Sequence, residues 1–285
     1  MPEGHSVRRL ADAFVARFQG HRVAASSPQG RFADGAAIID GLTLSQVDAH
    51  GKQMFLRFGN EAWLRVHLGM YGMWRFHGEG LAGFGRESVV LSDASAPESY
   101  PPAPVGAVRL RLDTGRNIAD LSGPSACVLM TPPEHDAFLA GLGEDPLRED
   151  ADPAKAYAKI NASRMPIAAL LMRQDIVAGI GNLYRAELLF RARLEPHKPG
   201  RDLTRADWDA LWRDGGELLR EGVRLGRIVC TRPEDRPKRK GPVRREDSFY
   251  VAHRAGLPCR ICGTPVRSET MAGRMLFWCE TCQVG

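Results

Sequence analysis

The chain has 285 residues, of which 44% are hydrophobic and 26% are charged, so it is long enough for two domains that each bury a core. The formal net charge of +5 suits a polyanionic partner where the basic side chains cluster, although a generic basic enzyme has the same charge. The sequence has no run of about 18 apolar residues that would span a membrane. Charged residues also interrupt the apolar positions near the N-terminus, so we expect no signal peptide and a cytoplasmic location.

The first residues after Met1 are Pro2 and Glu3, and they open a predicted helix that extends to Phe18. Apolar residues recur there with helical spacing, and proline is tolerated at a helix start because its missing N–H would have no partner. Removal of Met1 would leave Pro2 with a secondary amine, which titrates near pH ~8 and is partly nucleophilic at neutral pH. An iminium formed by such an amine has no N–H to lose and remains an electron sink. Most Met-Pro starts have no such role, so the remaining motifs must support it.

Residues from about 21 to 125 predict an antiparallel β-sandwich or barrel. Short apolar or alternating runs, typical of strands, occur at 54–58, 62–66, 89–91 and 108–112. Turn sequences such as Gly59-Asn60 separate them. The segment 95–104 contains four prolines and is expected to be a surface loop.

After Pro132 the apolar period becomes helical, and helices are predicted at 133–141, 153–159, 166–173, 182–192 and 204–225. The segment from Val177 to Asn182 is a glycine turn that leads into one of them. Such a turn presents backbone N–H groups and the Asn182 side chain to a phosphate, although most glycine turns are only connectors. The basic segment 232–247 is expected to be a linker or loop, and its charges are either solvated or in contact with DNA.

The C-terminus contains two CxxC pairs, sixteen residues apart, formed by Cys259, Cys262, Cys279 and Cys282. This spacing is typical of a zinc ribbon. Four thiolates leave no open coordination position, so the zinc is predicted to be structural and to contribute on the order of 10 kcal/mol to folding. A β-hairpin is expected at 268–278, with Arg274 at its tip, where a guanidinium can reach phosphates.

Together and in this order, these motifs resemble the formamidopyrimidine-DNA glycosylase/endonuclease VIII family over essentially the whole chain. Further similar segments are His50-Gly51-Lys52 (the lysine-bearing loop), 66–72 (the void-filling loop), 179–187 (the helix–two-turn–helix) and 273–279 (the zinc-finger hairpin tip). The resemblance implies an α+β multidomain fold. Its parts are a β-sandwich domain with an N-terminal helix at 1–125, a helical domain with the helix–two-turn–helix at 126–246, and a four-cysteine zinc module at 247–285.

The resemblance also implies a bifunctional DNA glycosylase/AP lyase of base excision repair. Such an enzyme acts as a monomer on damaged double-stranded DNA, with one structural zinc and no organic cofactor. Pro2 would attack C1′ of the damaged nucleotide, Glu3 would serve as general acid/base, and Lys52 would hold phosphate and support charge near the flipped nucleotide. The Schiff base would then allow β-elimination and δ-elimination to cut the strand on both sides.

Residues that grip the DNA follow from the same matches. Met70 and Tyr71 suit a wedge that fills the stack vacated by the flipped nucleotide. The alternative is plain core packing of a strand, with Tyr71 also able to lie under the loop. Contacts to phosphates are implied for Asn182 and Arg274. His67 is a further candidate for such a contact, and a structural role is its equal alternative. Glu187 is a supporting residue whose role is either structural, through an N-cap or salt bridge, or catalytic.

The first residues also indicate a branch of the family. The chain begins Pro2-Glu3-Gly4-His5-Ser6, whereas the formamidopyrimidine branch typically begins Pro-Glu-Leu-Pro-Glu. Gly4 is similar to the endonuclease VIII branch, especially its actinobacterial-type members, and favours oxidised pyrimidines, although His5 departs from the proline common there. Two alternatives remain: an oxidised-purine glycosylase of the same fold, and a non-catalytic zinc-ribbon nucleic-acid-binding protein. The second does not account for Glu3 next to Pro2, for Lys52 or for the wedge loop.

Overall fold

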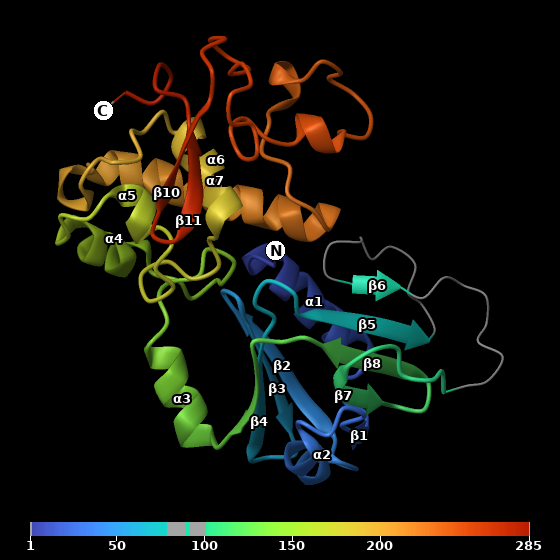
Figure 1. The fold of residues 1–285 in the computed structure, drawn as a ribbon. Coiled ribbons are helices and arrows are strands. Elements are labelled where there is room, and N and C mark those ends of the chain that lie inside the picture. Colours follow the sequence, from blue (N-terminus) through green and yellow to red (C-terminus); the bar gives the residue numbers. More distant parts are fainter. Residues whose placement is uncertain (1, 79–88, 92–100, 285) are drawn as a thin grey trace. The chain divides into compact units, whose positions relative to one another are not determined.

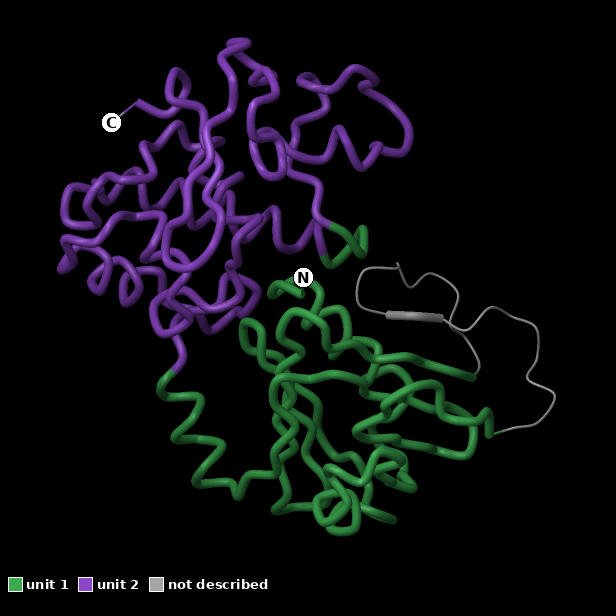
Figure 2. Tube along the Cα trace, viewed as in Figure 1, with its two compact units in different colours: residues 1–141, 223–227 green, residues 142–222, 228–285 purple. Residues whose placement is uncertain are grey.

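The computed structural model describes residues 2–78, 89–91 and 101–284. The chain separates into two compact units (Figures 1 and 2): unit 1 contains residues 1–141 and 223–227, and unit 2 contains residues 142–222 and 228–285. The three-part division expected from the sequence stays a prediction. Among the described residues, no helix has the length and apolar character needed to cross a membrane.

Unit 1 is built around two β-sheets. The four-stranded sheet has the order β2 (Leu44–His50), β3 (Gln53–Phe58), β4 (Ala62–His67) and β9 (Ala126–Met130). The five-stranded sheet has the order β1 (Ala24–Ser26), β7 (Val108–Asp113), β8 (Asn117–Ser122), β5 (Met73–Gly78) and β6 (Val89–Leu91). Neighbouring strands are antiparallel except for β5 and β6, which pair in parallel at one edge. The predicted β-sandwich is therefore confirmed, with one parallel pair that was not expected.

Helix α1 (Gly4–Arg17) is packed into the core of unit 1. The ring of Phe14 lies 4.8 Å from that of Trp74 and 5.2 Å from that of Phe76, both edge-on, an arrangement that aromatic rings favour. Trp74 and Phe76 belong to β5, while α1 also contacts β2 and β3. The helix that follows Pro2 therefore contacts both sheets and is fixed in the unit.

Three features of unit 1 compare differently with the sequence prediction. Helix α2 (Ala33–Ile39) occurs in the stretch predicted as strands, because seven residues with two buried side chains are too few to show a helical period. Helix α3 (Pro132–Ala140) was predicted, and its Thr131–Glu134 capping box explains its start. Of the proline-containing loop predicted at 95–104, residues 95–100 lie outside the described residues.

Unit 2 contains a helical core to which the C-terminal hairpin contributes. Its elements are α4 (Pro153–Asn161), α5 (Ile167–Leu170), α6 (Asn182–Arg191), most of α7 (Arg205–Leu225), β10 (Arg267–Met271) and β11 (Arg274–Trp278), with short 3₁₀ turns at Gly200–Asp202, Pro233–Asp235 and Arg245–Asp247. Leu276 of β11 is buried in the same cluster as Tyr184 and Trp208. Helix α5 is shorter than predicted because the chain tightens after it, with Met172 N–H bonded to the Ala169 carbonyl.

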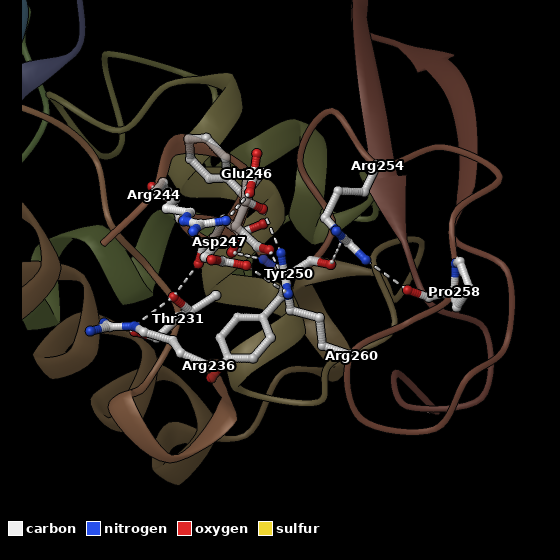
Figure 3. Close-up of polar contacts among 12 residues, drawn as sticks. Thr231, Arg236, Arg244, Glu246, Asp247, Tyr250, Arg254, Pro258 and Arg260 are labelled. Atoms are coloured by element: carbon white, nitrogen blue, oxygen red, sulfur yellow. Dashed lines mark hydrogen bonds and ion pairs between the residues drawn. The ribbon is translucent and has the colours of Figure 1, made fainter. Parts of the chain in front are cut away.

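The basic segment 232–247 is a loop with a closed base (Figure 3). The Thr231 hydroxyl donates to the Asp247 carbonyl at 2.6 Å, so the two ends of the segment lie side by side. The Tyr250 hydroxyl accepts from the Arg232 N–H at 2.9 Å and donates to the Asp235 carboxylate at 2.5 Å. The guanidinium of Arg260 pairs with Asp247 at 3.4 Å. The loop is therefore pinned to unit 2 at its base.

Glu187, in the middle of α6, holds the chain that continues from this loop. Its carboxylate is fully buried and accepts main-chain N–H bonds from Tyr250, Val251 and Ala252, each at 2.8 Å. Burial raises the pKa of Glu187, and the three N–H groups oppose that shift. The three main-chain donors favour the structural alternative for Glu187 over the catalytic one, and its role stays a prediction. The contacts differ from the N-cap or salt bridge that the structural alternative named.

Replacing Glu187 with glutamine is expected to lower the free energy of unfolding of unit 2 by about 3 kcal/mol, because the amide cannot accept from all three buried N–H groups. Urea unfolding followed by tryptophan fluorescence measures the change. Glu217→Gln on α7 is the matched control, since Glu217 is exposed, and it should shift the midpoint little. Equal midpoints for the two variants would show that the clamp is not needed.

Candidate active site and metal centre

Pro2 and Glu3 lie directly before α1, and both are buried. The Ser6 hydroxyl accepts from the Glu3 N–H at 3.1 Å and donates to the Glu3 carbonyl at 2.8 Å. The Ser6 N–H donates to the same carbonyl at 2.9 Å. In the sequence, Ser6 stands where the formamidopyrimidine branch typically has a glutamate. In the structure its hydroxyl closes the first helical turn and fixes the backbone of Glu3.

His5 is a buried neutral group in this first turn. Burial lowers the pKa of His5 to about 3, and the charge of Arg9 acts in the same direction. The imidazole therefore carries no positive charge at neutral pH. A buried neutral ring there adds no cation to the terminal segment.

Lys52 lies at the tip of the hairpin that joins β2 to β3. His50 pairs with Gln53, so Gly51 and Lys52 form a two-residue turn, and Gly51 has a φ of +58° that favours glycine. After burial, the positive charges of Lys52 and Arg65 lower the pKa of His67, the last residue of β4. The structure therefore brings Lys52 and His67 into one cationic region of unit 1.

The segment that follows β4 is a tight loop that displays two large apolar side chains. The Gly72 N–H donates to the Leu68 carbonyl at 2.9 Å, and a Cβ on Gly72 would lie only 2.3 Å from that oxygen, so the turn requires glycine there. Met70 is 47% exposed and Tyr71 is 79% exposed. Neither residue packs as the buried face of a strand, and Tyr71 does not lie under the loop.

Asn182 is the first residue of α6, and both the nitrogen and the oxygen of its side-chain amide form hydrogen bonds. Its Nδ2 donates to the Met275 carbonyl at 2.8 Å, and its Oδ1 accepts from Arg185 Nη2 at 2.5 Å. Met275 directly follows Arg274 in β11, so the predicted pair Asn182 and Arg274 is brought to one part of unit 2. A phosphate contact from Asn182 would then use its main-chain N–H or its second amide hydrogen.

The glycine turn before α6 depends on Gln174, which sequence reasoning missed. The Gln174 Nε2 donates to the Ile180 carbonyl at 2.9 Å, and its Oε1 accepts from the Gly179 N–H at 3.1 Å. Gly179 has a φ of +92°, a conformation that favours glycine. A lone glutamine upstream of the turn is the only signal in the sequence, and it has no characteristic spacing.

The hairpin tip is a two-residue turn formed by Ala272 and Gly273. Met271 pairs with Arg274, and the φ angles of the turn residues are +51° and +70°, as a type I′ turn requires. Arg274 is exposed at the start of β11. The tip therefore presents the guanidinium-bearing residue that the sequence placed there.

The four cysteines of the CxxC pairs come together as a metal-binding set. Their sulfur atoms all lie within 4.8 Å of one another, with 3.9 Å between the Cys259 and Cys282 sulfurs and 3.4 Å between those of Cys262 and Cys279. Thiolates at about 2.3 Å from a tetrahedral zinc are about 3.8 Å apart. The set fits one zinc with no position left for water, so the ion would stabilise the fold and take no part in the reaction.

Comparison with protein families gives matches along most of the chain. The formamidopyrimidine-DNA glycosylase N-terminal domain matches residues 1–121. The formamidopyrimidine-DNA glycosylase H2TH domain matches residues 142–233. The zinc finger found in FPG and IleRS matches residues 256–284. Each match covers one of the motifs described above.

Individual relatives match nearly full-length. Endonuclease 8 1 of Mycobacterium tuberculosis is 40% identical over 283 residues, covering 99% of this chain and 100% of that protein. Formamidopyrimidine-DNA glycosylase of Thermus thermophilus is 31% identical, covering 87% of this chain and 85% of the relative. The structure of Lactococcus lactis Fpg with abasic-site DNA superposes with a TM-score of 0.77 at 20% identity, covering 99% and 100% of the two chains. The chain belongs to the formamidopyrimidine-DNA glycosylase/endonuclease VIII family, whose members are DNA glycosylase/AP lyases of base excision repair.

Proposed function

We propose that this protein removes oxidised pyrimidines from double-stranded DNA in the nucleoid and cuts the strand through a Schiff base on Pro2. The observation that carries the proposal is the start of α1, where Pro2 precedes a buried Glu3 whose backbone is fixed by Ser6. Gly4 supports the pyrimidine preference, as does the 40% identity to endonuclease 8 1 of Mycobacterium tuberculosis.

The chemistry starts with attack of the Pro2 nitrogen on C1′ of the damaged nucleotide. The bond from C1′ to the base breaks, and the base leaves with the proton that the Pro2 nitrogen loses. Glu3 donates a proton to the ring oxygen as the sugar opens, and an iminium joins Pro2 to the sugar. The iminium makes the C2′ proton acidic, so its removal breaks the bond to the 3′ phosphate. A second elimination releases the 5′ phosphate, and addition of water returns the Pro2 amine.

The remaining site residues hold the DNA in place for this reaction. Flipping a nucleotide out of a duplex costs a few kcal/mol, and the exposed Met70 and Tyr71 are suited to fill the gap in the stack. Lys52 and His67 in unit 1 are proposed to contact phosphates near the flipped nucleotide. Asn182 and Arg274 in unit 2 are proposed to contact phosphates as well.

Borohydride trapping on abasic-site DNA tests the Schiff base. The protein from which Met1 has been removed is expected to give a covalent adduct. A protein with a short N-terminal extension has no free amine on Pro2 and should give none. An equal extension at the C-terminus is the matched control and should trap normally. An adduct with the N-terminally extended protein would overturn the role of Pro2.

Glu3→Gln should slow excision of a damaged base by about 10²–10⁴-fold, the usual contribution of general acid/base catalysis.

The lesion preference is tested by single-turnover excision from otherwise identical duplexes. Thymine glycol is expected to be removed faster than 8-oxoguanine opposite cytosine, as the Gly4-containing start indicates. Abasic-site cleavage measured on the same scaffold serves as the internal reference for active enzyme. Faster release of 8-oxoguanine would replace the pyrimidine assignment by the oxidised-purine one and leave the Schiff-base chemistry intact.

Met70→Ala is expected to slow excision from an intact duplex by about tenfold or more. Flipping a nucleotide costs a few kcal/mol, and the variant no longer offsets part of that cost by filling the gap in the stack. Cleavage at a preformed abasic site should fall less, since no paired base has to leave the stack. Met165→Ala is a suitable control because Met165 is also an exposed methionine, at 42%. Equal losses on the two substrates would argue against a wedge.

A further inference from the structure

The Ser125 hydroxyl makes two contacts with one residue, His67. Its Oγ donates to the His67 main-chain carbonyl at 3.0 Å and lies 2.6 Å from the His67 Nδ1. The Ser125 N–H also donates to the His67 carbonyl, at 2.9 Å. Gly69 packs against the serine, because a Cβ on Gly69 would lie 3.0 Å from both Ser125 Cβ and Oγ. The serine therefore joins the end of β4, the imidazole and the wedge loop.

These contacts select one form of the imidazole. A hydroxyl has a single proton, and a carbonyl oxygen only accepts. If the Ser125 proton lies toward the carbonyl, the hydroxyl oxygen accepts at 2.6 Å, and Nδ1 must carry a hydrogen. The reverse arrangement would leave the hydroxyl and carbonyl oxygens 3.0 Å apart with no proton between them. In the neutral ring Nε2 is then a bare acceptor.

A bare acceptor cannot bind a phosphate, whose oxygens also accept. Two charged groups act on His67: Lys52 in the β2–β3 turn, and Arg65 on its own strand, β4. Together with burial they favour the neutral ring in the protein alone. An arriving phosphate reverses this balance, because its negative charge offsets both cations and favours the imidazolium.

We propose that Ser125 is a positioning residue that makes phosphate binding by His67 depend on uptake of a proton at Nε2. This inference rests on the proposed function, since it assumes that a DNA phosphate reaches the region of Lys52 and His67. The proton comes from solvent, no covalent bond forms or breaks other than N–H, and the resulting imidazolium donates to the phosphate from Nε2. Damaged DNA is therefore bound together with one proton.

The direction of the pH effect follows from the two pKa values. The pKa of His67 is low in the free protein and higher in the complex, so affinity is greatest below the free-state pKa. Affinity then falls by up to about tenfold per pH unit until the pKa of the complex is passed. A neutral Nε2–H form would show no such slope.

Calorimetric titration with a duplex that contains a tetrahydrofuran abasic-site analogue tests the proposal, because this analogue cannot form a Schiff base. Runs in two buffers of different ionisation enthalpy, from about pH 6 to about pH 8, give the number of protons taken up. The wild type and Ser125→Thr are expected to take up more protons than His67→Gln, whose amide donates at every pH. Ser125→Ala should lose most of that difference, since a ring without the serine can place its neutral hydrogen on Nε2.

Ser45→Ala is the matched control. Its hydroxyl also donates to main-chain carbonyls of unit 1, at 2.7 Å to Gly59 and 3.1 Å to Arg57, and proton uptake should stay at the wild-type value. Borohydride trapping by Ser125→Ala on a true abasic site shows whether that variant is folded. If Ser125→Ala takes up as many protons as the wild type, or His67→Gln does, the inference is wrong. Absence of trapping by the wild type would instead refute the proposed function itself.

Discussion

The proposed chemistry depends on one constraint, which is that a chain terminus must be held still while its amine remains available. A terminal residue is tethered on one side only and is usually among the least ordered parts of a protein. Here the tether is α1, whose Phe14 meets two aromatic rings of β5 and whose first turn is closed by the Ser6 hydroxyl. How firmly the Pro2 amine is held in place therefore depends on packing in unit 1, several residues away from the amine itself.

In unit 2, the hairpin formed by β10 and β11 is too small to have its own core, so its position depends on contacts with the helices. Leu276 extends into the helical core, and Asn182 bonds the main chain of β11. His197 lies 2.5 Å from the carboxylates of Glu195 and Glu269; burial lowers its pKa, but the two carboxylates outweigh burial and raise it above the usual value. The hairpin thus joins the helices through apolar, amide and ionic contacts, so Arg274 extends from a supported base.

The sequence predicts the parts of this structure that repeat or have a fixed spacing. The helical period before Phe18, the alternating strands and the CxxC pairs all belong to this class, and the structure contains each of them. It does not predict contacts made by one polar side chain with distant main chain. Gln174, Ser125 and the three donors of Glu187 are of this kind. Their partners are set by tertiary packing, which leaves no period to detect. Helix α2 was missed for a different reason, because its seven residues are too few to show a helical period.

The proposed proton uptake depends on how charge is arranged in unit 1. In the protein alone, burial keeps His5 neutral, and burial together with the charges of Lys52 and Arg65 lowers the pKa of His67. Lys52 and Arg65 provide positive charge in the protein alone. The bond between Ser125 and Nδ1 is proposed to keep Nε2 of His67 without a hydrogen until a proton is taken up. In the proposed complex, a phosphate would relieve the repulsion that disfavours the charged ring, so the cationic region would gain charge only when DNA is bound. Such coupling favours bound DNA without the cost of keeping a third cation close to Lys52 and Arg65 in the empty site.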